Sequence, residues 1–210
     1  MNDIHHLEYQ HESGIGAECI AASVYCGAHK PIPIYTLVTR TPKFLDAEVE
    51  KHRLLSSNSS SSRAIPLSKL AAQIREDPYV PFDVRKAQKG MQGDKRLSGL
   101  DLRGFQQAWR GRAMRIAYSA EYLADTYGIH KQHINRLLEP FAWQYKVITA
   151  TEWDNFFTLR LAPDAQPDMR IAAECMRDAI DNATCIERGP DDWHIPFERD
   201  EDRELSLYER

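Results

Sequence analysis

Cationic and hydroxyl side chains are concentrated in one short stretch of the sequence. Lys51, His52 and Arg53 open the stretch, Arg63 closes it, and residues 56–62 between them are six serines and one asparagine. Arginine forks, hydroxyl groups and free backbone N–H groups are the donors that proteins use to bind phosphate. The stretch therefore indicates an anion-binding loop.

Composition gives a second interpretation of the serine run. A segment of such low complexity is often a flexible linker. The flanking sequence favours an anion loop, because a helical pattern leads into the run and an amphipathic stretch over 64–74 follows Arg63. The loop would then be held between two elements.

Further polar residues that could bind a ligand lie in the second half of the chain. Arg136 falls in a short helical pattern over 131–138, and Asn155 and Arg160 fall in another over 152–161. Taken alone, an arginine on a helix is most often a solvated surface group. His130 and His133 lie three apart, but no carboxylate or thiol is in register with them, so we expect no metal site.

Helices and short strands must position these residues. The patterns predict strands over 15–24, 34–38 and 146–151, and helices over 43–55, 100–127, 131–138, 152–161 and 164–186. The helix over 100–127 is expected to be largely buried and to end at Gly128, and residues 77–95 are expected to form a loop or lid. Because strands and helices do not strictly alternate, we expect an α+β fold with long central helices and a small, mostly antiparallel sheet.

Length and composition limit the class of protein. A chain of 210 residues can bury a core without staples, and we expect a single domain over 1–199 followed by a charged tail over 200–210. The net charge of -4 and the pI of about 6.1 argue against a general nucleic-acid binder. No apolar run approaches a membrane span and no secretion signal is evident, which predicts a cytoplasmic protein without a membrane partner.

The spacing of the cysteines matches no metal-binding or disulfide motif. Cys19, Cys26, Cys175 and Cys185 are widely spaced and include no CxxC pair. Neither a zinc site nor a disulfide framework is therefore indicated, and we expect buried free thiols.

The 51–63 stretch resembles the signature of the flavin-dependent thymidylate synthases. That signature reads R-H-R, two residues, S, one residue, N, two residues, S, one residue, R. The chain matches it at His52, Arg53, Ser56, Asn58, Ser61 and Arg63, and departs from it at the first position, where Lys51 replaces Arg. Lysine keeps the charge but loses the bidentate geometry.

A second block is similar to the C-terminal part of the same family. There an N-F-x-x-L-R run precedes an A-Q pair, and Asn155, Leu159, Arg160, Ala165 and Gln166 stand at those positions. KAQKGMQ at 86–92 and WHIPF at 193–197 are similar to segments of short, phage-type members. The resemblance covers most of 43–197, with departures at Glu48, Ser59 and Asp164, where many members have Gln, Glu and His.

The resemblance implies a reaction and its cofactors. Members methylate dUMP to dTMP, with methylenetetrahydrofolate as the carbon donor and with FAD that is reduced by NADPH. The route needs no protein nucleophile, and no cysteine here stands in the Pro-Cys-His setting of the folate enzyme that works without flavin. The cofactor then carries the difficult chemistry, and the protein binds and orients.

Roles for single residues follow from the same resemblance. It implies that His52, Arg53 and Asn155, with Lys51 and Asn58, hold FAD. It implies that Ser61, Arg63, Arg136 and Arg160 hold dUMP, and that Arg160 and Ser61 are the catalytic residues, with Arg160 stabilising negative charge on the uracil. It also implies a homotetramer whose active sites are shared between subunits, so the motif loop and Arg160 need not meet within one chain.

Two other functions remain open from the residues. The departures at Lys51, Glu48, Ser59 and Asp164 are also compatible with a degenerate member that binds flavin or nucleotide without turnover. A helical scaffold, in which the serine run is only a linker, is the third hypothesis. Flavin binding separates the first two from the third, and turnover separates the first from the second.

Overall fold

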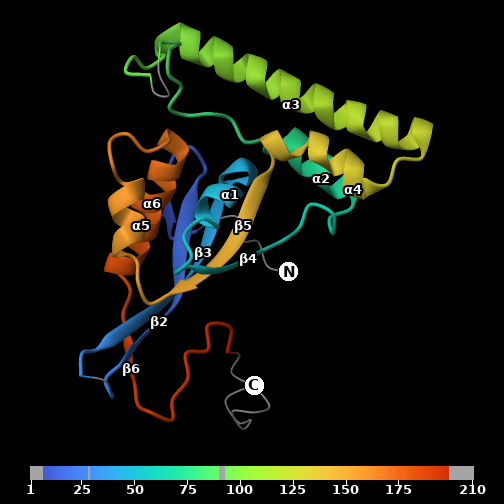
Figure 1. Ribbon diagram of the computed structural model, residues 1–210. Helices are drawn as coiled ribbons and strands as arrows, with labels where there is room; N and C mark the ends of the chain where they lie inside the picture. The colour runs from blue at the N-terminus through green and yellow to red at the C-terminus, as the bar shows by residue number, and fades with distance from the viewer. Residues whose placement is uncertain (1–6, 28, 90–92, 199–210) are drawn as a thin grey trace.

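The computed structural model describes residues 7–27, 29–89 and 93–198. The predicted tail over 200–210 lies outside these residues. Within them, strands far apart in the sequence form one six-stranded sheet in the order β1–β2–β3–β5–β4, and β6 also pairs with β2 (Figure 1). The strands are β1 (Tyr9–Gln10), β2 (Gly16–Tyr25), β3 (Ile32–Pro42), β4 (Ser56–Ser59), β5 (Trp143–Ala150) and β6 (Ile186–Arg188). All pairings are antiparallel except the parallel pairing of β6 with β2.

The helices complete a mixed fold, which confirms the expected α+β class. They are η1 (Lys43–Leu45), α1 (Asp46–Val49), α2 (Leu67–Glu76), α3 (Gly99–Tyr127), α4 (Lys131–Ile134), η2 (Asn135–Leu137), η3 (Glu139–Phe141), α5 (Asp154–Arg160) and α6 (Pro167–Asp181), where η denotes a 3-10 helix. In Figure 1, α5 and α6 lie along the sheet, whereas α3 lies with α2 and α4 at one end of the molecule.

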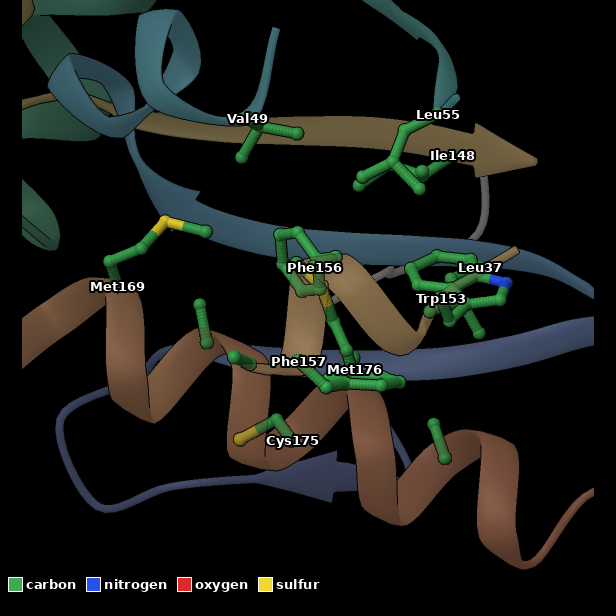
Figure 2. Close-up of a cluster of buried hydrophobic side chains, with 14 of the residues drawn as sticks. Leu37, Val49, Leu55, Ile148, Trp153, Phe156, Phe157, Met169, Cys175 and Met176 are labelled. Atoms are coloured by element: carbon green, nitrogen blue, oxygen red, sulfur yellow. The ribbon is translucent and has the colours of Figure 1, made fainter. Parts of the chain in front are cut away.

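The larger hydrophobic core lies between the sheet and α6. Alternate residues of β5 are buried, so that Ile148 and Ala150 share one face with Leu37 of β3. Figure 2 shows Phe156, Phe157 and Met176 filling the space between these strands and α6. Burying one such side chain contributes about 1.5–3 kcal/mol to stability.

A second, smaller core joins the remaining helices. It consists of Leu70, Ala71 and Ile74 of α2, Ala113, Ala117 and Ala120 of α3, and Ile134, Leu138 and Ala142 near α4. The alanines at positions 113, 117 and 120 follow helical spacing, so they let α2 approach α3 closely. Helix α3 ends at Gly128, which has φ of 63°, as the sequence predicts.

The expectation that α3 is largely buried is wrong for a single chain. Ala113, Ala117 and Ala120 are its buried residues, whereas Leu100, Met114, Tyr118, Tyr122 and Tyr127 are exposed large hydrophobic residues. The periodicity marks the apolar positions of a helix but does not say whether its own chain covers them.

The boundaries around the motif stretch also differ from the prediction. The helix expected over 43–55 ends at Val49, and the chain turns before β4. Ser56–Ser59 were expected to lie in a loop or linker. They form an edge strand that pairs with Thr149–Lys146 of β5. The linker interpretation is therefore wrong, because backbone pairing with a neighbouring strand outweighs the weak intrinsic strand preference of serine.

The other boundaries shift by smaller amounts. Helix α6 ends at Asp181 rather than 186, and the short strands β1 and β6 were not predicted. The helix expected over 131–138 is α4 followed by the 3-10 turn η2, and a further 3-10 turn, η3, contains Pro140. Residues 77–95, where described, form a loop as expected.

All four cysteines are free, as expected, but the expectation that they are buried holds for Cys175 and is wrong for Cys26. Cys175 is buried and Cys26 is exposed, while Cys19 and Cys185 are intermediate. Among the described residues, no helix combines the length and the apolar character needed to cross a membrane.

Candidate functional site

Two residues that lie 108 positions apart in the sequence meet at the surface beside α1. Arg160, at the end of α5, donates from Nε to Nε2 of His52 over 2.9 Å. Its other two nitrogens donate to Glu48, from Nη1 to the carboxylate Oε2 over 3.0 Å and from Nη2 to the backbone oxygen over 3.3 Å. All three nitrogens of the guanidinium are therefore engaged by residues of the same chain.

This arrangement fixes the chemical state of His52. Because Nε2 accepts a hydrogen bond, a neutral ring carries its proton on Nδ1. Partial burial lowers the pKa of His52 below its ordinary value, and the charge of Arg160 lowers it further. The ring also packs edge-on against Phe156, with 4.9 Å between centroids. His52 is thus a neutral, oriented side chain at neutral pH.

The short helix α1, which carries Glu48, is held to the sheet by a buried cation. Lys146 of β5 is 3% exposed and forms ion pairs with Asp46 and, over 3.4 Å, with Glu50. Val49 anchors the same helix in the larger core. Residues 46 and 50 lie one turn apart and share a face, which leaves Glu48 directed elsewhere, toward Arg160.

A second group of contacts ties the end of the serine run to the segment after α4. Asn135, which is fully buried, donates from Nδ2 to the backbone oxygens of Ser62 and Ile65 over 2.7 and 3.0 Å. Ser62 donates to Oε1 of Glu139 over 2.6 Å, and Nη1 of Arg136 contacts the same oxygen over 2.8 Å. Arg136 and the end of the run are therefore brought to one place.

Most of the residues predicted from the sequence lie on the surface of the chain. Lys51, Arg53, Asn58, Ser61, Arg63, Arg136 and Asn155 are exposed, whereas His52 and Arg160 are partly buried. The Ser61 hydroxyl accepts from the backbone N–H of Arg63 over 3.3 Å, which closes a tight turn. The contacts join His52 with Arg160, and Arg136 with the serine run, as two separate groups.

A cavity of about 570 Å³ lies beside the second group. Its lining residues are Lys43, Phe44, Asp46, Ala47, Glu50, Trp109, Arg136, Glu139 and Pro140. Phe44 and Trp109 give it an apolar wall, and Arg136 and Glu139 give it a polar edge. Arg136 is the predicted site residue that belongs to this lining.

Several residues that shape the site were not predicted as site residues from the sequence. Glu48 was noted only as a departure from the family pattern. Asn135 and Glu139 were not predicted as site residues, although they flank Arg136 and Pro140. Lys146 looked like an ordinary strand residue. A polar residue on the core-facing side of an alternating strand was the available signal for Lys146; nothing in the sequence revealed the partners of Asn135.

The described residues contain no cluster of three or more His, Cys, Asp or Glu side chains that could hold a metal ion. His130 instead caps α4, since its Nδ1 accepts from the backbone N–H of Gln132 over 3.3 Å. The ring nitrogen Nε2 of His133 contacts the side chain of Gln132 over 3.1 Å.

Comparison with known proteins identifies similar sequences and folds. A model of the family described as "Thymidylate synthase complementing protein" matches residues 32–184. The structure is similar to a UMP/dUMP methylase, PolB from Streptomyces cacaoi, bound with 5-Br UMP, with a TM-score of 0.55 and 22% identity over 70% of this chain and 68% of that one. The same methylase bound with 5-Br dUMP gives a TM-score of 0.55 and 22% identity, over 70% of this chain and 65% of that one. No match is found among curated protein sequences.

Proposed function

Because the chain belongs to the thymidylate synthase complementing protein family, the flavin-dependent thymidylate synthases, we propose that it methylates dUMP to dTMP with FAD, NADPH and methylenetetrahydrofolate. The observation that carries the proposal is the 2.9 Å hydrogen bond between His52 of the motif stretch and Arg160 of the second block. Two segments matched separately by the family pattern thus meet at one surface. A cytoplasmic location fits this activity and is part of the proposal.

The donor set of the motif stretch fits a flavin dinucleotide. Lys51 and Arg53 are exposed cations beside the oriented ring of His52, and Asn58 adds an exposed amide on the edge strand β4. A pyrophosphate needs cationic and N–H donors of this kind. His52, Arg53 and Asn155, with Lys51 and Asn58, would hold FAD, and when bound it would supply the hydride and transfer the one-carbon unit to the base.

The second group fits the phosphate of dUMP. Arg63 and Arg136 are exposed, and Ser61 presents a hydroxyl at the turn that it forms with Arg63. A nucleotide monophosphate carries close to two negative charges and is best held by such forks. Asn135 and Glu139 keep the turn and Arg136 together.

Arg160 is suited to act on the base instead of the phosphate. It is partly buried, so its field is less screened than that of a surface arginine. Placed near the uracil oxygens, it would stabilise negative charge on the ring as carbon 5 becomes nucleophilic. This is the catalytic role that we propose for Arg160, with Ser61 helping to orient the substrate.

The cysteines support a route without a protein nucleophile. Burial raises the pKa of the Cys175 thiol to about 11, and burial also raises the pKa of Cys19, so both remain protonated at neutral pH. The thiols of Cys175 and Cys185 face the backbone oxygen of Ile15 and the Tyr35 hydroxyl. Neither hydrogen bond involves a candidate site residue.

The exposed apolar side of α3 supports assembly into a homotetramer. Met114, Tyr118 and Tyr122 are spaced four residues apart and are 42%, 58% and 66% exposed. A row of large apolar side chains at helical spacing is typical of a helix that packs against a partner. Assembly could also bring the two groups of site residues together from different subunits.

A binding experiment tests the cofactor and substrate assignments. Purified protein is incubated with FAD, freed of unbound flavin, and titrated with dUMP while the flavin absorbance is recorded. The proposal predicts a retained flavin spectrum that dUMP perturbs in a saturable way. Retained flavin with no response to dUMP would favour a degenerate flavin binder, and the absence of both would favour a scaffold.

A further inference from the structure

We propose that Glu48 is a positioning residue for Arg160: its carboxylate and backbone oxygen hold the guanidinium against His52 and offset its charge. Arg160 then meets the uncharged oxygens of the base, while the phosphate is left to Arg63 and Arg136. The inference rests on the proposed function, because it gives Glu48 a part in the handling of the same substrate.

The geometry of Arg160 carries the first step. A guanidinium that is free in solvent samples many orientations, but here each of its three nitrogens has an acceptor on Glu48 or His52. The side chain of Arg160 is 19% exposed and that of Glu48 is 30% exposed. The Arg160 N–H groups that make none of these hydrogen bonds are therefore oriented before a ligand binds. Less conformational entropy of the side chain is then lost on binding.

The anchoring of α1 carries the second step. Glu48 can fix Arg160 only if its own helix is fixed, and this single turn is tied to β5 by Asp46 and Glu50 through the buried Lys146. Val49, next to Glu48, is 2% exposed in the larger core. Position 48 is thus the residue of this turn that reaches Arg160.

Charge carries the third step. A carboxylate 3.0 Å from Nη1 offsets part of the positive potential that Arg160 would otherwise present to an anion. A glutamine at this position, common in the family, would keep a hydrogen bond but not the charge. Glu48 therefore lowers the net charge that Arg160 presents before substrate binds, while the directed N–H groups remain to donate to a uracil oxygen as negative charge develops there.

The pKa of His52 depends on the balance of charge between Arg160 and Glu48. Arg160 from α5 contacts His52 directly, Glu48 from α1 pairs with Arg160, and the Phe156 ring covers another side, while the neighbouring cations Lys51 and Arg53 are exposed to solvent. Removing the carboxylate leaves Arg160 uncompensated, which disfavours protonation of His52. Removing the guanidinium has the opposite effect. The two changes therefore shift the titration of His52 in opposite directions.

Titration of His52 by NMR tests the inference without any turnover. Glu48→Gln should lower the pKa of His52 by roughly half a unit, and Arg160→Gln should raise it by a similar amount. The matched control is Glu152→Gln, which removes an exposed carboxylate just before α5 that plays no part in holding α1 or Arg160. The inference fails if Glu48→Gln and Arg160→Gln leave the titration unmoved or shift it in the same direction.

Kinetics of the flavin-loaded enzyme complete the test. Glu48→Ala, which removes both the carboxylate charge and its hydrogen bond to Arg160, should lower kcat roughly tenfold while KM for dUMP stays within about twofold, because the phosphate contacts are untouched. The acid limb of the pH–rate profile should move to lower pH with His52. A purely structural Glu48 would lower the melting temperature and leave both the kcat/KM split and the acid limb unchanged. If the wild type shows no turnover, the proposed function fails while the NMR result still decides the role of Glu48.

Discussion

Arg63 and Arg160 have the same side chain in very different surroundings. Arg160 is held on three nitrogens and partly buried, whereas Arg63 is exposed and its backbone N–H closes a turn with Ser61. We therefore propose that Arg160 makes a directed contact with the base and that Arg63 binds the phosphate. The difference between these proposed roles rests on the surroundings of the two side chains and not on residue type.

Replacement of Arg63 tests the phosphate assignment. Arg63→Ala should weaken dUMP binding roughly tenfold or more, since a hydrogen bond to a charged group contributes about 1.5–3 kcal/mol. FAD retention should be unchanged. Isothermal titration with dUMP measures the effect, and Arg112→Ala, at an exposed position of α3, is the control. An unchanged dUMP affinity would remove Arg63 from the site.

The lowered pKa values of two histidines predict how the stability of the protein depends on pH. Burial lowers the pKa of His52 and of His194, and the charges of Arg160 and Arg188 lower them further. The unfolded chain therefore binds more protons than the folded chain below the ordinary value of 6.5. The contribution of both groups is fully present above pH 6.5 and is lost as pH falls through their lowered pKa values.

The melting temperature measured from pH 7.5 to 5.5 checks this dependence. It should decline toward acid pH, and His194→Gln, which removes one of the two groups, should make the decline shallower. His194 bridges the Ser23 and Thr36 hydroxyls at 2.9 and 2.8 Å, so this variant should also be less stable at pH 7.5. His133→Gln, at an exposed position, should leave the slope as it is; an equal slope in all three proteins would contradict the account.

At the scale of elements, the motif stretch keeps its conformation because other segments hold it. Strand β4 pairs with β5, α1 is tied to Lys146, and the turn after Ser61 is clamped by Asn135 and Glu139. Each clamp joins segments that are far apart in the sequence. The serine run therefore has a fixed shape despite its low complexity.

Asn135 provides the test of this clamp. Asn135→Ala removes two hydrogen bonds and leaves the oxygens of Ser62 and Ile65 without that donor, which should cost about 1–3 kcal/mol of unfolding free energy. The dUMP affinity should fall along with it while FAD binding persists. Asn182→Ala, at an exposed position where Nδ2 contacts Asp178, should cost no more than about 0.5 kcal/mol.

Urea unfolding and dUMP titration measure the two effects of Asn135→Ala. A loss of stability with unchanged dUMP affinity would show that the turn does not depend on Asn135 for its position. A loss of FAD binding as large as the loss of dUMP binding would show that the substitution disrupts the fold as a whole and not only the turn after Ser61.

Some elements could be predicted from the sequence because their signals are local. The pattern of α3, its end at Gly128 and the amphipathic α2 depend on residues close in the chain. Strand β4 and the early end of α1 could not be predicted, since both are set by pairing with β5 and by Lys146. Likewise the family pattern points to His52 and Arg160, but the hydrogen bond between them and the ion pair of Arg160 with Glu48 exist only in the folded chain.

At the scale of the whole molecule, the sheet core and the helical core serve different purposes. The sheet core is closed by α6, whereas α3 in the helical core leaves a row of apolar side chains exposed. A charged residue in that row should therefore act on assembly more than on folding. This separation makes the oligomeric state a property that a single substitution can test.

Tyr122→Glu tests the proposed assembly. Tyr122 is 66% exposed, so the change should alter the unfolding free energy of the single chain by no more than about 0.5 kcal/mol. In an interface it would bury an unpaired charge and shift the protein to smaller species. Light scattering coupled to size exclusion measures the mass. A tetrameric wild type with an equally tetrameric variant would place the interface elsewhere, and a monomeric wild type would contradict the proposed homotetramer.

The most direct test of the proposed reaction is an anaerobic assay of the purified protein with FAD, NADPH, methylenetetrahydrofolate and dUMP, in which dTMP is measured by chromatography. The account predicts dTMP formation that depends on added flavin and persists when all four cysteines are replaced. Absence of product from protein that retains flavin would contradict the proposed activity and favour a degenerate binder.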